Sequence, residues 1–200
     1  MNKICYPKTN SLHKGENSMN ETLQTIQSRY SCRSFTGEAL KKEDVEAIAM
    51  AALQSPSGMN TQPWQILVVQ DKEFLNDMDV TTMEMLAKQE DQTVYNRIMS
   101  RGGKLYYNTP CMFMIAKKPG TDLDCGIVAE NIALAASSLG LGNVICGLAR
   151  LSFQTEKGTA YKAKLIPEGY EFGVAVLVGY PTNTEGTPHM VDMSKVTYIG

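Results

Sequence analysis

The protein has 200 residues, of which 19 are lysine or arginine and 21 are aspartate or glutamate, so its formal net charge at pH 7 is only −2. This length fits one domain, or one domain with a tail, and a hydrophobic fraction of 43% is ordinary for a globular protein. The sequence has no basic stripe that would favour nucleic acid. It also has no apolar stretch long enough to span a membrane, and residues 1–18 do not resemble a secretory signal.

The first half of the chain predicts two helices before the first strand. Residues 1–18 are polar and aperiodic, and we interpret them as a tail or extension before a domain at 19–200. Asn20 is a good N-cap for a short helix that ends near Ser28. An amphipathic helix is expected over residues 42–54, followed by a buried strand at 64–70. Residues 72–90 predict a helix whose methionines fill the core.

The second half predicts three more strands, at residues 111–116, 143–148 and 171–180, and a weaker helix at 155–165. Residues 91–108 are polar, and their pattern assigns them to no element. The helix expected at 122–139 is apolar on several sides, which in a chain of this size predicts cover by a second subunit. Gly140 should end this helix, and Asn131 within it must find hydrogen-bond partners. The irregular strand spacing indicates a three-layer α+β fold.

Residues 54–64 form the stretch around which the chain is organised, and they read Gln-Ser-Pro-Ser-Gly-Met-Asn-Thr-Gln-Pro-Trp. Pro56 ends the preceding helix, Gly58 and Asn60 allow a left-handed backbone, and Pro63 can open the next strand. The many uncharged hydroxyl and amide groups suit a flat ligand with an apolar face and a polar edge. The alternative interpretation is a rigid connector between a helix and a strand.

Arg29, Ser31 and Arg33 lie in one short segment. Guanidinium groups pair bidentately with phosphate oxygens, so the segment could clamp an anion, although a solvated basic turn is the simpler alternative. Lys104, taken alone, is an ordinary surface lysine. The glycines at 140 and 142 match a dinucleotide-binding fingerprint only weakly, because they end a helix rather than begin one.

The cysteines and histidines predict neither a metal site nor a disulfide scaffold. The chain has five cysteines without a C-x-x-C pair, and its two histidines, His13 and His189, lie near opposite ends. Free thiols in a reducing cytoplasm are expected. Cys146 as a nucleophile is the alternative, but no neighbouring histidine or cation in the sequence activates it, so we favour an inert thiol.

Three segments together resemble the nitroreductase family of flavoproteins, and the resemblance covers roughly residue 19 to the C-terminus. They are Arg29-x-Ser31-x-Arg33-x-Phe35, then Ser55-Pro56-Ser57-Gly58-x-Asn60-Thr-Gln62-Pro63-Trp64, then Leu139-Gly-Leu-Gly142 with Pro167-Glu-Gly-Tyr170 and Val178-Gly-Tyr-Pro181. The resemblance implies an α/β/α fold with a mixed, mainly antiparallel sheet flanked by helices. It also implies an FMN cofactor, NADH or NADPH as co-substrate, and a homodimer in which both subunits build each flavin site.

The resemblance also implies roles for individual residues. Arg29, Tyr30, Ser31 and Arg33 would hold the phosphate and the ribityl or pyrimidine edge of FMN. Pro56, Ser57, Gly58, Asn60 and Gln62 would come from the other subunit and pack on the ring. Lys104 would lie near N1 and O2, where a cation stabilises the negative charge of the reduced flavin. The backbone around Ile145, Cys146 and Gly147 would face the N5 edge.

One segment departs from the family pattern. Members often carry a lysine or arginine after the last strand that reaches the phosphate, but residues 188–192 read Pro-His-Met-Val-Asp. His189 and Lys195 are the available substitutes. Without either, Arg29 and Arg33 alone would meet the phosphate dianion, and FMN would bind more weakly.

The implied mechanism is ping-pong. A nicotinamide stacks on the flavin, gives a hydride to N5 and leaves before a nitroaromatic, a quinone or a similar flat oxidant takes its place. FMN carries the chemistry, so no catalytic side chain is required, in agreement with the absence of a Ser/His/Asp or Cys/His pattern. The alternatives are a non-catalytic FMN-binding or storage module, a purely structural dimer, and a family offshoot acting on a flavin, an iodinated aromatic or an unsaturated carbonyl.

Overall fold

The computed structural model describes residues 19–183, 186 and 190–200. Its helices are α1 (Glu21–Ser28), α2 (Lys42–Leu53), α3 (Lys72–Ala87), α4 (Thr93–Met99), α5 (Asp122–Ser138) and α6 (Gly158–Leu165), with 3-10 turns η1 (Gly58–Asn60), η2 (Gly147–Gln154) and η3 (Met193–Lys195). The strands are β1 (Trp64–Val69), β2 (Cys111–Lys117), β3 (Gly142–Cys146) and β4 (Glu171–Gly179).

The four strands form one sheet in the order β1-β2-β4-β3, and each neighbouring pair is antiparallel. A parallel bridge between Ser31 and Asn143 adds the segment after α1 to the outer side of β3. Every residue of β2 is buried, because helices cover both faces of the sheet. Its alternate side chains supply two separate cores, with Met112 and Met114 in one and Phe113 and Ile115 in the other.

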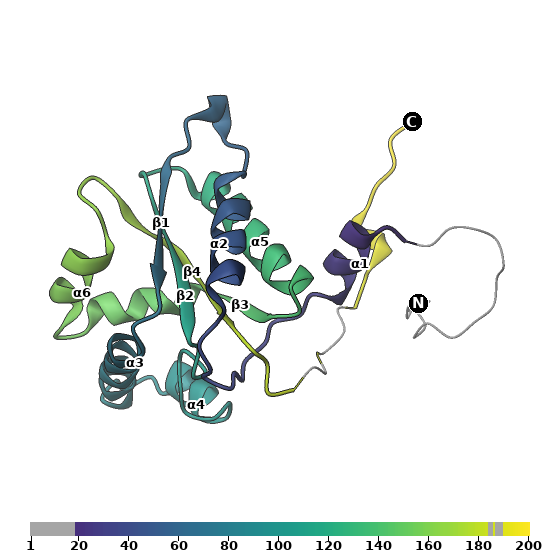
Figure 1. Ribbon diagram of the computed structural model, residues 1–200. Helices are drawn as coiled ribbons and strands as arrows, with labels where there is room; N and C mark the ends of the chain where they lie inside the picture. Colours follow the sequence, from purple (N-terminus) through teal and green to yellow (C-terminus); the bar gives the residue numbers. More distant parts are fainter. Residues whose placement is uncertain (1–18, 184–185, 187–189) are drawn as a thin grey trace.

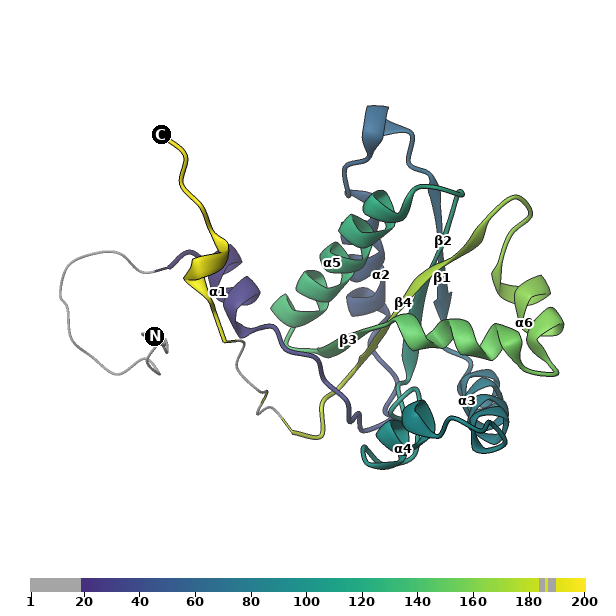
Figure 2. The same ribbon diagram turned by 180° about the vertical axis from the view of Figure 1, so that it is seen from behind.

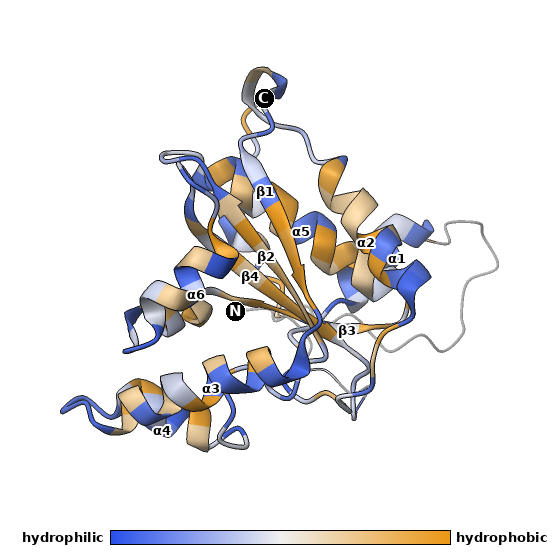
Figure 3. Ribbon diagram, turned by 60° about the vertical axis from the view of Figure 1, so that its left-hand side comes forward, coloured by the Kyte–Doolittle hydropathy of each residue, from blue (hydrophilic) through white to orange (hydrophobic). Residues whose placement is uncertain are grey.

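Helices cover the two faces of the sheet in separate layers. Figure 3 shows the hydrophobic strands between α2 and α5 on one side and α3, α4 and α6 on the other. The core shared by α2 and α5 includes Ile48 and Ile132, and the opposite core includes Met78 of α3 and Tyr161 of α6. The predicted three-layer α+β fold is therefore confirmed. No helix in the described ranges has the length and apolar character needed to cross a bilayer.

Three residues singled out in the sequence make the cap, the helix end and the hydrogen bond that we expected of them. The side chain of Asn20 accepts a 3.0 Å hydrogen bond from the amide of Leu23 and caps α1. Gly140 adopts a φ of 74° beyond the end of α5, and its amide donates to the carbonyl of Ser137. The side-chain amide of Asn131 donates to Oγ of Ser55 at 2.9 Å, as a half-buried amide must.

Some predicted boundaries were wrong. The strand expected at 143–148 ends at Cys146, because Gly147 and the residues after it turn into η2. The polar segment 91–108, which received no assignment, contains α4. The helix expected from residue 155 begins at Gly158, since the hydroxyl of Thr155 bonds the carbonyl of Ser152 and closes the preceding turn.

The two ends of the described chain carry apolar side chains that the chain does not cover. Figures 1 and 2 show α1 and the C-terminal segment to one side of the sheet and its helices. None of the residues of α1 is buried, and its Leu23 and Ile26 are exposed. Tyr198 and Ile199 near the C-terminus are 84% and 96% exposed. These exposed apolar groups are available to contact another molecule.

Candidate functional site

The segment that contains Arg29, Ser31 and Arg33 is held beside β3 by its backbone. The amide of Cys32 donates to the carbonyl of Asn143 at 2.8 Å, next to the bridge between Ser31 and Asn143. A few residues later, the amide of Phe35 donates to the carbonyl of Tyr107 at 3.2 Å. These bonds bring the arginine segment next to both β3 and the residues that follow Lys104.

The arginine segment combines exposed and anchored groups. Arg33 is exposed, and its Nη1 donates to the carbonyl of Ser31 at 3.2 Å. Arg29 is half-buried at the C-terminal end of α1. The hydroxyl of Tyr30 donates to the carbonyl of Asn183 at 2.9 Å and fixes the segment to the chain beyond β4.

Lys104 is exposed and borders a cavity of about 270 Å³. Asp79, Tyr106 and Asn108 line the same cavity, and the side-chain amide of Asn108 donates to the carbonyl of Phe35 at 3.4 Å. The lining of the cavity at Lys104 is therefore hydrogen-bonded to the residue that follows the arginine segment by two positions, although more than seventy residues separate Lys104 from Arg33 in the sequence.

The segment Ile145–Gly147 lies close to one charge from the arginine segment and one from the lining of the cavity. Burial raises the pKa of the Cys146 thiol to about 11, while nearby Asp79 raises it and nearby Arg33 lowers it by smaller amounts. The thiol is thus protonated at neutral pH, as expected for an inert cysteine rather than a nucleophile. Ile145 and Gly147, on either side of it, are exposed.

Gly58 and Gly147, which lie in two of the candidate segments, both leave bare backbone with open space beside it. Gly58 and Gly147 both have ordinary φ values, and a Cβ built on either would meet no atom of the chain within 4 Å. Neither backbone strain nor internal packing therefore explains the missing side chain at these positions. The open space at both positions leaves room for the close approach of a ligand or of another chain.

The loop before β1 has a left-handed backbone at one of the two positions where we expected it. Asn60 has a φ of 54°, as expected, whereas Gly58 does not have a positive φ. Met59 (51°) and Gln62 (47°) are also left-handed, which the sequence did not indicate. Hydrogen bonds hold this shape, because Ser57 accepts from the amides of Asn60 and Gln62 at 3.0 and 2.9 Å. Strained non-glycine residues of this kind concentrate at functional sites.

The same loop lies far from the other candidate groups. Trp64 pairs with Lys117 and Val69 pairs with Met112, so the loop is at the Lys117 end of β2 and Lys104 is at the Cys111 end. Seven residues of strand separate these ends by roughly 20 Å. Figure 1 shows η1 projecting beyond the sheet at this far end. One chain thus brings together Arg29–Arg33, Lys104 and 145–147, but not Pro56, Ser57, Gly58, Asn60 or Gln62.

The two candidate substitutes for a phosphate cation have different outcomes. His189 lies outside the described residues. Lys195 is exposed in η3, in the C-terminal segment. Within the described ranges, no group of three histidine, cysteine or carboxylate side chains could hold a metal ion.

Sequence reasoning missed three residues that support these groups. Asp79 and Ser152 are buried polar residues, and Asp124 bonds the loop at Gly58. An aspartate within a polar stretch of a helix, or a serine after a strand, gives no signal in the sequence. Only the packing of α3 against the residues after Lys104 and against η2 buries the first two.

Comparison with known proteins gives a matching family and several relatives. Residues 26–180 match the family described as "Nitroreductase family". The crystal structure of a nitroreductase with bound FMN from Desulfitobacterium hafniense DCB-2 is 46% identical, with a TM-score of 0.87 over 92% of this chain and 100% of that one. An FMN reductase (NADPH) of Bacillus subtilis is 26% identical over 84% of this chain and 69% of its own length. An iodotyrosine deiodinase of Haliscomenobacter hydrossis is 32% identical over 90% of this chain and 87% of its own length.

Proposed function

Because the chain belongs to the nitroreductase family, we propose that it passes a hydride from NADH or NADPH, through FMN, to a flat organic oxidant such as a nitroaromatic or a quinone. The relatives confirm the predicted class, an FMN-dependent oxidoreductase that uses a nicotinamide co-substrate. The proposal extends this class to the roles of individual residues, the shared site and the order of binding.

The convergence of three segments from distant parts of the sequence carries the proposal. Guanidinium groups at Arg29 and Arg33, with the hydroxyl of Ser31, suit a phosphate and a ribityl chain. The exposed ammonium of Lys104 suits the N1 and O2 edge of the flavin, which gains negative charge on reduction. Bare backbone at Gly147 admits a flat ring close to its amide. The chemistry of these donors therefore fits FMN.

The remaining part of the site supports a homodimer. Residues 56–62 lie at the opposite end of β2 from Lys104, so a second copy must supply them if they are to pack on the same ring. The exposed apolar residues of α1 and of the C-terminal segment would gain cover in the same assembly. Leu123, at the start of the apolar helix α5, is also exposed.

When bound, FMN would supply the hydride chemistry at N5. Lys104 would stabilise the negative charge that develops near N1, and the amide at Gly147 would hydrogen-bond the N5 edge. The strained loop of the second subunit would wall one side of the ring. This would leave a single open face, at which a flat donor and a flat acceptor bind in turn.

The experiment is an anaerobic titration of the purified protein. We expect a yellow protein whose visible absorbance is bleached by NADH or NADPH and restored by a nitroaromatic or a quinone. Steady-state rates should give parallel double-reciprocal lines, because the two substrates share one face. A protein that does not take up FMN at micromolar concentration would refute the proposal. Bound FMN that neither nicotinamide bleaches would instead identify a binding or storage module.

The location that we propose is the cytoplasm. The four cysteines in the described part of the chain, Cys32, Cys111, Cys125 and Cys146, are buried free thiols. Such thiols persist in a reducing compartment.

A further inference from the structure

A buried carboxylate in α3 holds the two residues that directly follow Lys104. Asp79 is only 6% exposed. Its Oδ1 accepts from the amide of Leu105 at 2.9 Å, and its Oδ2 accepts from the amide of Tyr106 at 3.1 Å. Each oxygen of one side chain thus fixes one peptide unit, so the backbone orientation immediately after Lys104 depends on this carboxylate.

Burying the carboxylate of Asp79 costs stability that an apolar side chain at this position would not cost. Burial raises the pKa of Asp79, and the two amides and the charge of Lys104 offset part of that rise. A carboxylate removed from water is unfavourable unless its hydrogen bonds are good, and an apolar residue at such a position is often equally stable. The two bonds to consecutive amides give the carboxylate a role that an apolar side chain could not fill.

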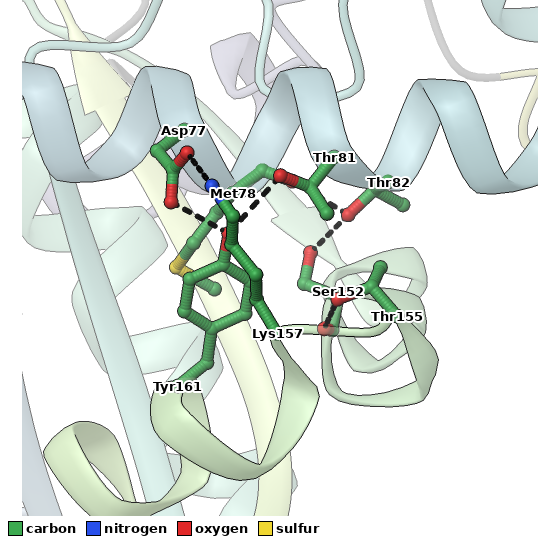
Figure 4. Close-up of polar contacts among 8 residues, drawn as sticks. All are labelled: Asp77, Met78, Thr81, Thr82, Ser152, Thr155, Lys157 and Tyr161. Carbon is green, nitrogen blue, oxygen red and sulfur yellow. Dashed lines mark hydrogen bonds and ion pairs between the residues drawn. The ribbon is translucent and has the colours of Figure 1, made fainter.

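A second contact from α3 holds the same segment. The hydroxyl of Tyr106 and Oγ of Ser152 are 2.5 Å apart, and Oγ of Ser152 is 2.7 Å from Oγ1 of Thr82. Figure 4 shows Thr82 on α3 facing Ser152 on η2, the turn that begins at Gly147. The polar edge of α3 therefore connects the segment after Lys104 with the segment after Cys146, which are two sides of the candidate site.

We propose that Asp79 is a positioning residue that directs Lys104 toward the flavin and thereby raises the reduction potential of bound FMN. The proposal rests on the proposed function, because it assumes that Lys104 faces N1 and O2. Asp79 itself lines the same cavity as Lys104 but acts on the cofactor through the lysine. An ammonium held at that edge stabilises the reduced flavin more than one that samples many orientations.

The test measures the midpoint potential of FMN in the holoprotein. Lys104→Gln should disfavour reduction at least tenfold, a shift of about 30 mV for a two-electron couple. Asp79→Asn, which can satisfy only one of the two amides, and Asp79→Glu, whose longer side chain changes the fit, should each lower the potential by a similar amount. In the Lys104→Gln background, Asp79→Asn should add little. The control is Asp77→Asn, because Asp77 lies on the same helix but bonds Tyr161 and Lys157 of the α6 region (Figure 4), and it should leave the potential unchanged.

The outcomes separate this proposal from its alternatives. If the charge of Asp79 acted directly on the flavin, Asp79→Asn would raise the potential and Asp79→Glu would leave it unchanged, and either result overturns the proposal. Should both variants fail to fold, hydrogen exchange of the wild-type holoprotein decides whether Asp79 holds this backbone. Rapid exchange at the amides of Leu105 and Tyr106 would show that their hydrogen bonds to Asp79 do not fix the segment after Lys104. Failure of the wild type to bind FMN would refute the proposed function itself. Normal FMN binding with a shift for Lys104→Gln but none for Asp79 variants would refute only this inference.

Discussion

The amide of Gly58 donates a 3.0 Å hydrogen bond to Oδ1 of Asp124, which joins the exposed turn η1 to the first turn of α5. The base of the same loop is also bound to α5, since Ser55 accepts from the side-chain amide of Asn131. One helix thus holds both the base and the tip of the loop. The tip carries a nearly fully exposed Met59 with a left-handed backbone, so these anchors offset strain that would otherwise let the loop relax.

We therefore expect Asp124→Ala to weaken FMN binding without unfolding the protein. The variant loses one solvent-exposed hydrogen bond, which contributes about 0.5–1.5 kcal/mol, so the Kd for FMN should rise about threefold to tenfold. Titration of the apoprotein, followed by the quenching of flavin fluorescence, measures the change. Asp124→Asn keeps Oδ1 as an acceptor and is the matched control. Equal affinity of the alanine variant and the wild type would show that the loop does not depend on this anchor.

The arginine segment should matter more for FMN binding than the C-terminal lysine does. Arg33→Ala removes an exposed guanidinium from the segment that we propose as the phosphate site, at a cost of roughly 1.5–3 kcal/mol. Lys195→Ala removes a cation from the exposed turn η3. We expect a Kd increase for Arg33→Ala that clearly exceeds that for Lys195→Ala. The reverse order, in the same titration, would mean that the C-terminal segment has taken over the phosphate.

Ser152→Ala should destabilise the fold. The side chain is fully buried and bonds the hydroxyls of Thr82 and Tyr106, so alanine would leave the buried phenol without this partner. An unsatisfied buried polar group costs about 1–3 kcal/mol, which urea unfolding would detect as a lower midpoint with an unchanged slope. Ser138→Ala is the control, because Ser138 is exposed and bonds only its own helix. A midpoint within error of the wild type would show that the network adapts.

Periodicity predicted the elements whose pattern reflects burial. The amphipathic stripe of α2 and the apolar runs of β1, β2 and β4 follow directly from which side chains enter the two cores. The polar helix α4 was missed because only Ile98 in it is fully buried, so its sequence lacks a strong apolar stripe. The end of β3 was misplaced because the apolar pattern of the strand continues to Leu148, beyond the point where the backbone turns at Gly147.

In the candidate site, too, the sequence could predict some residues but not others. Arg29, Arg33, Lys104 and the glycine-containing segments carry recognisable side chains and motifs, so the sequence could nominate them. Asp79 could not be nominated, because its role depends on two amides that lie more than twenty residues away in the sequence. The strain at Met59 was also hidden, since a left-handed backbone at a non-glycine residue is decided by hydrogen bonds of the whole loop.

A buried lysine lies in β2, at the end of the sheet opposite Lys104. The side chain of Lys117 is 6% exposed, and its ammonium bonds Glu171 on the adjacent strand and lies 3.2 Å from Oδ1 of Asp122. Both carboxylates are more open to water, at 51% and 81% exposure. Because a buried charge that loses one of its two partners is costly, Glu171→Ala should destabilise the fold by about 1.5–3 kcal/mol. Lys117→Met should cost less, since the two carboxylates it leaves behind can be hydrated.

The same pair predicts how stability depends on pH. The hydrogen bond to Glu171 is the main cause that raises the pKa of Lys117 above its ordinary value of 10.5. The folded state therefore holds this proton more tightly than the unfolded state does, so the contribution is complete below about pH 10.5 and is lost as the pH rises through the folded pKa. Urea unfolding between pH 8 and pH 12 should show a steeper alkaline loss of stability for the wild type than for Lys117→Met. Parallel curves for the two proteins would exclude the ion pair as the cause.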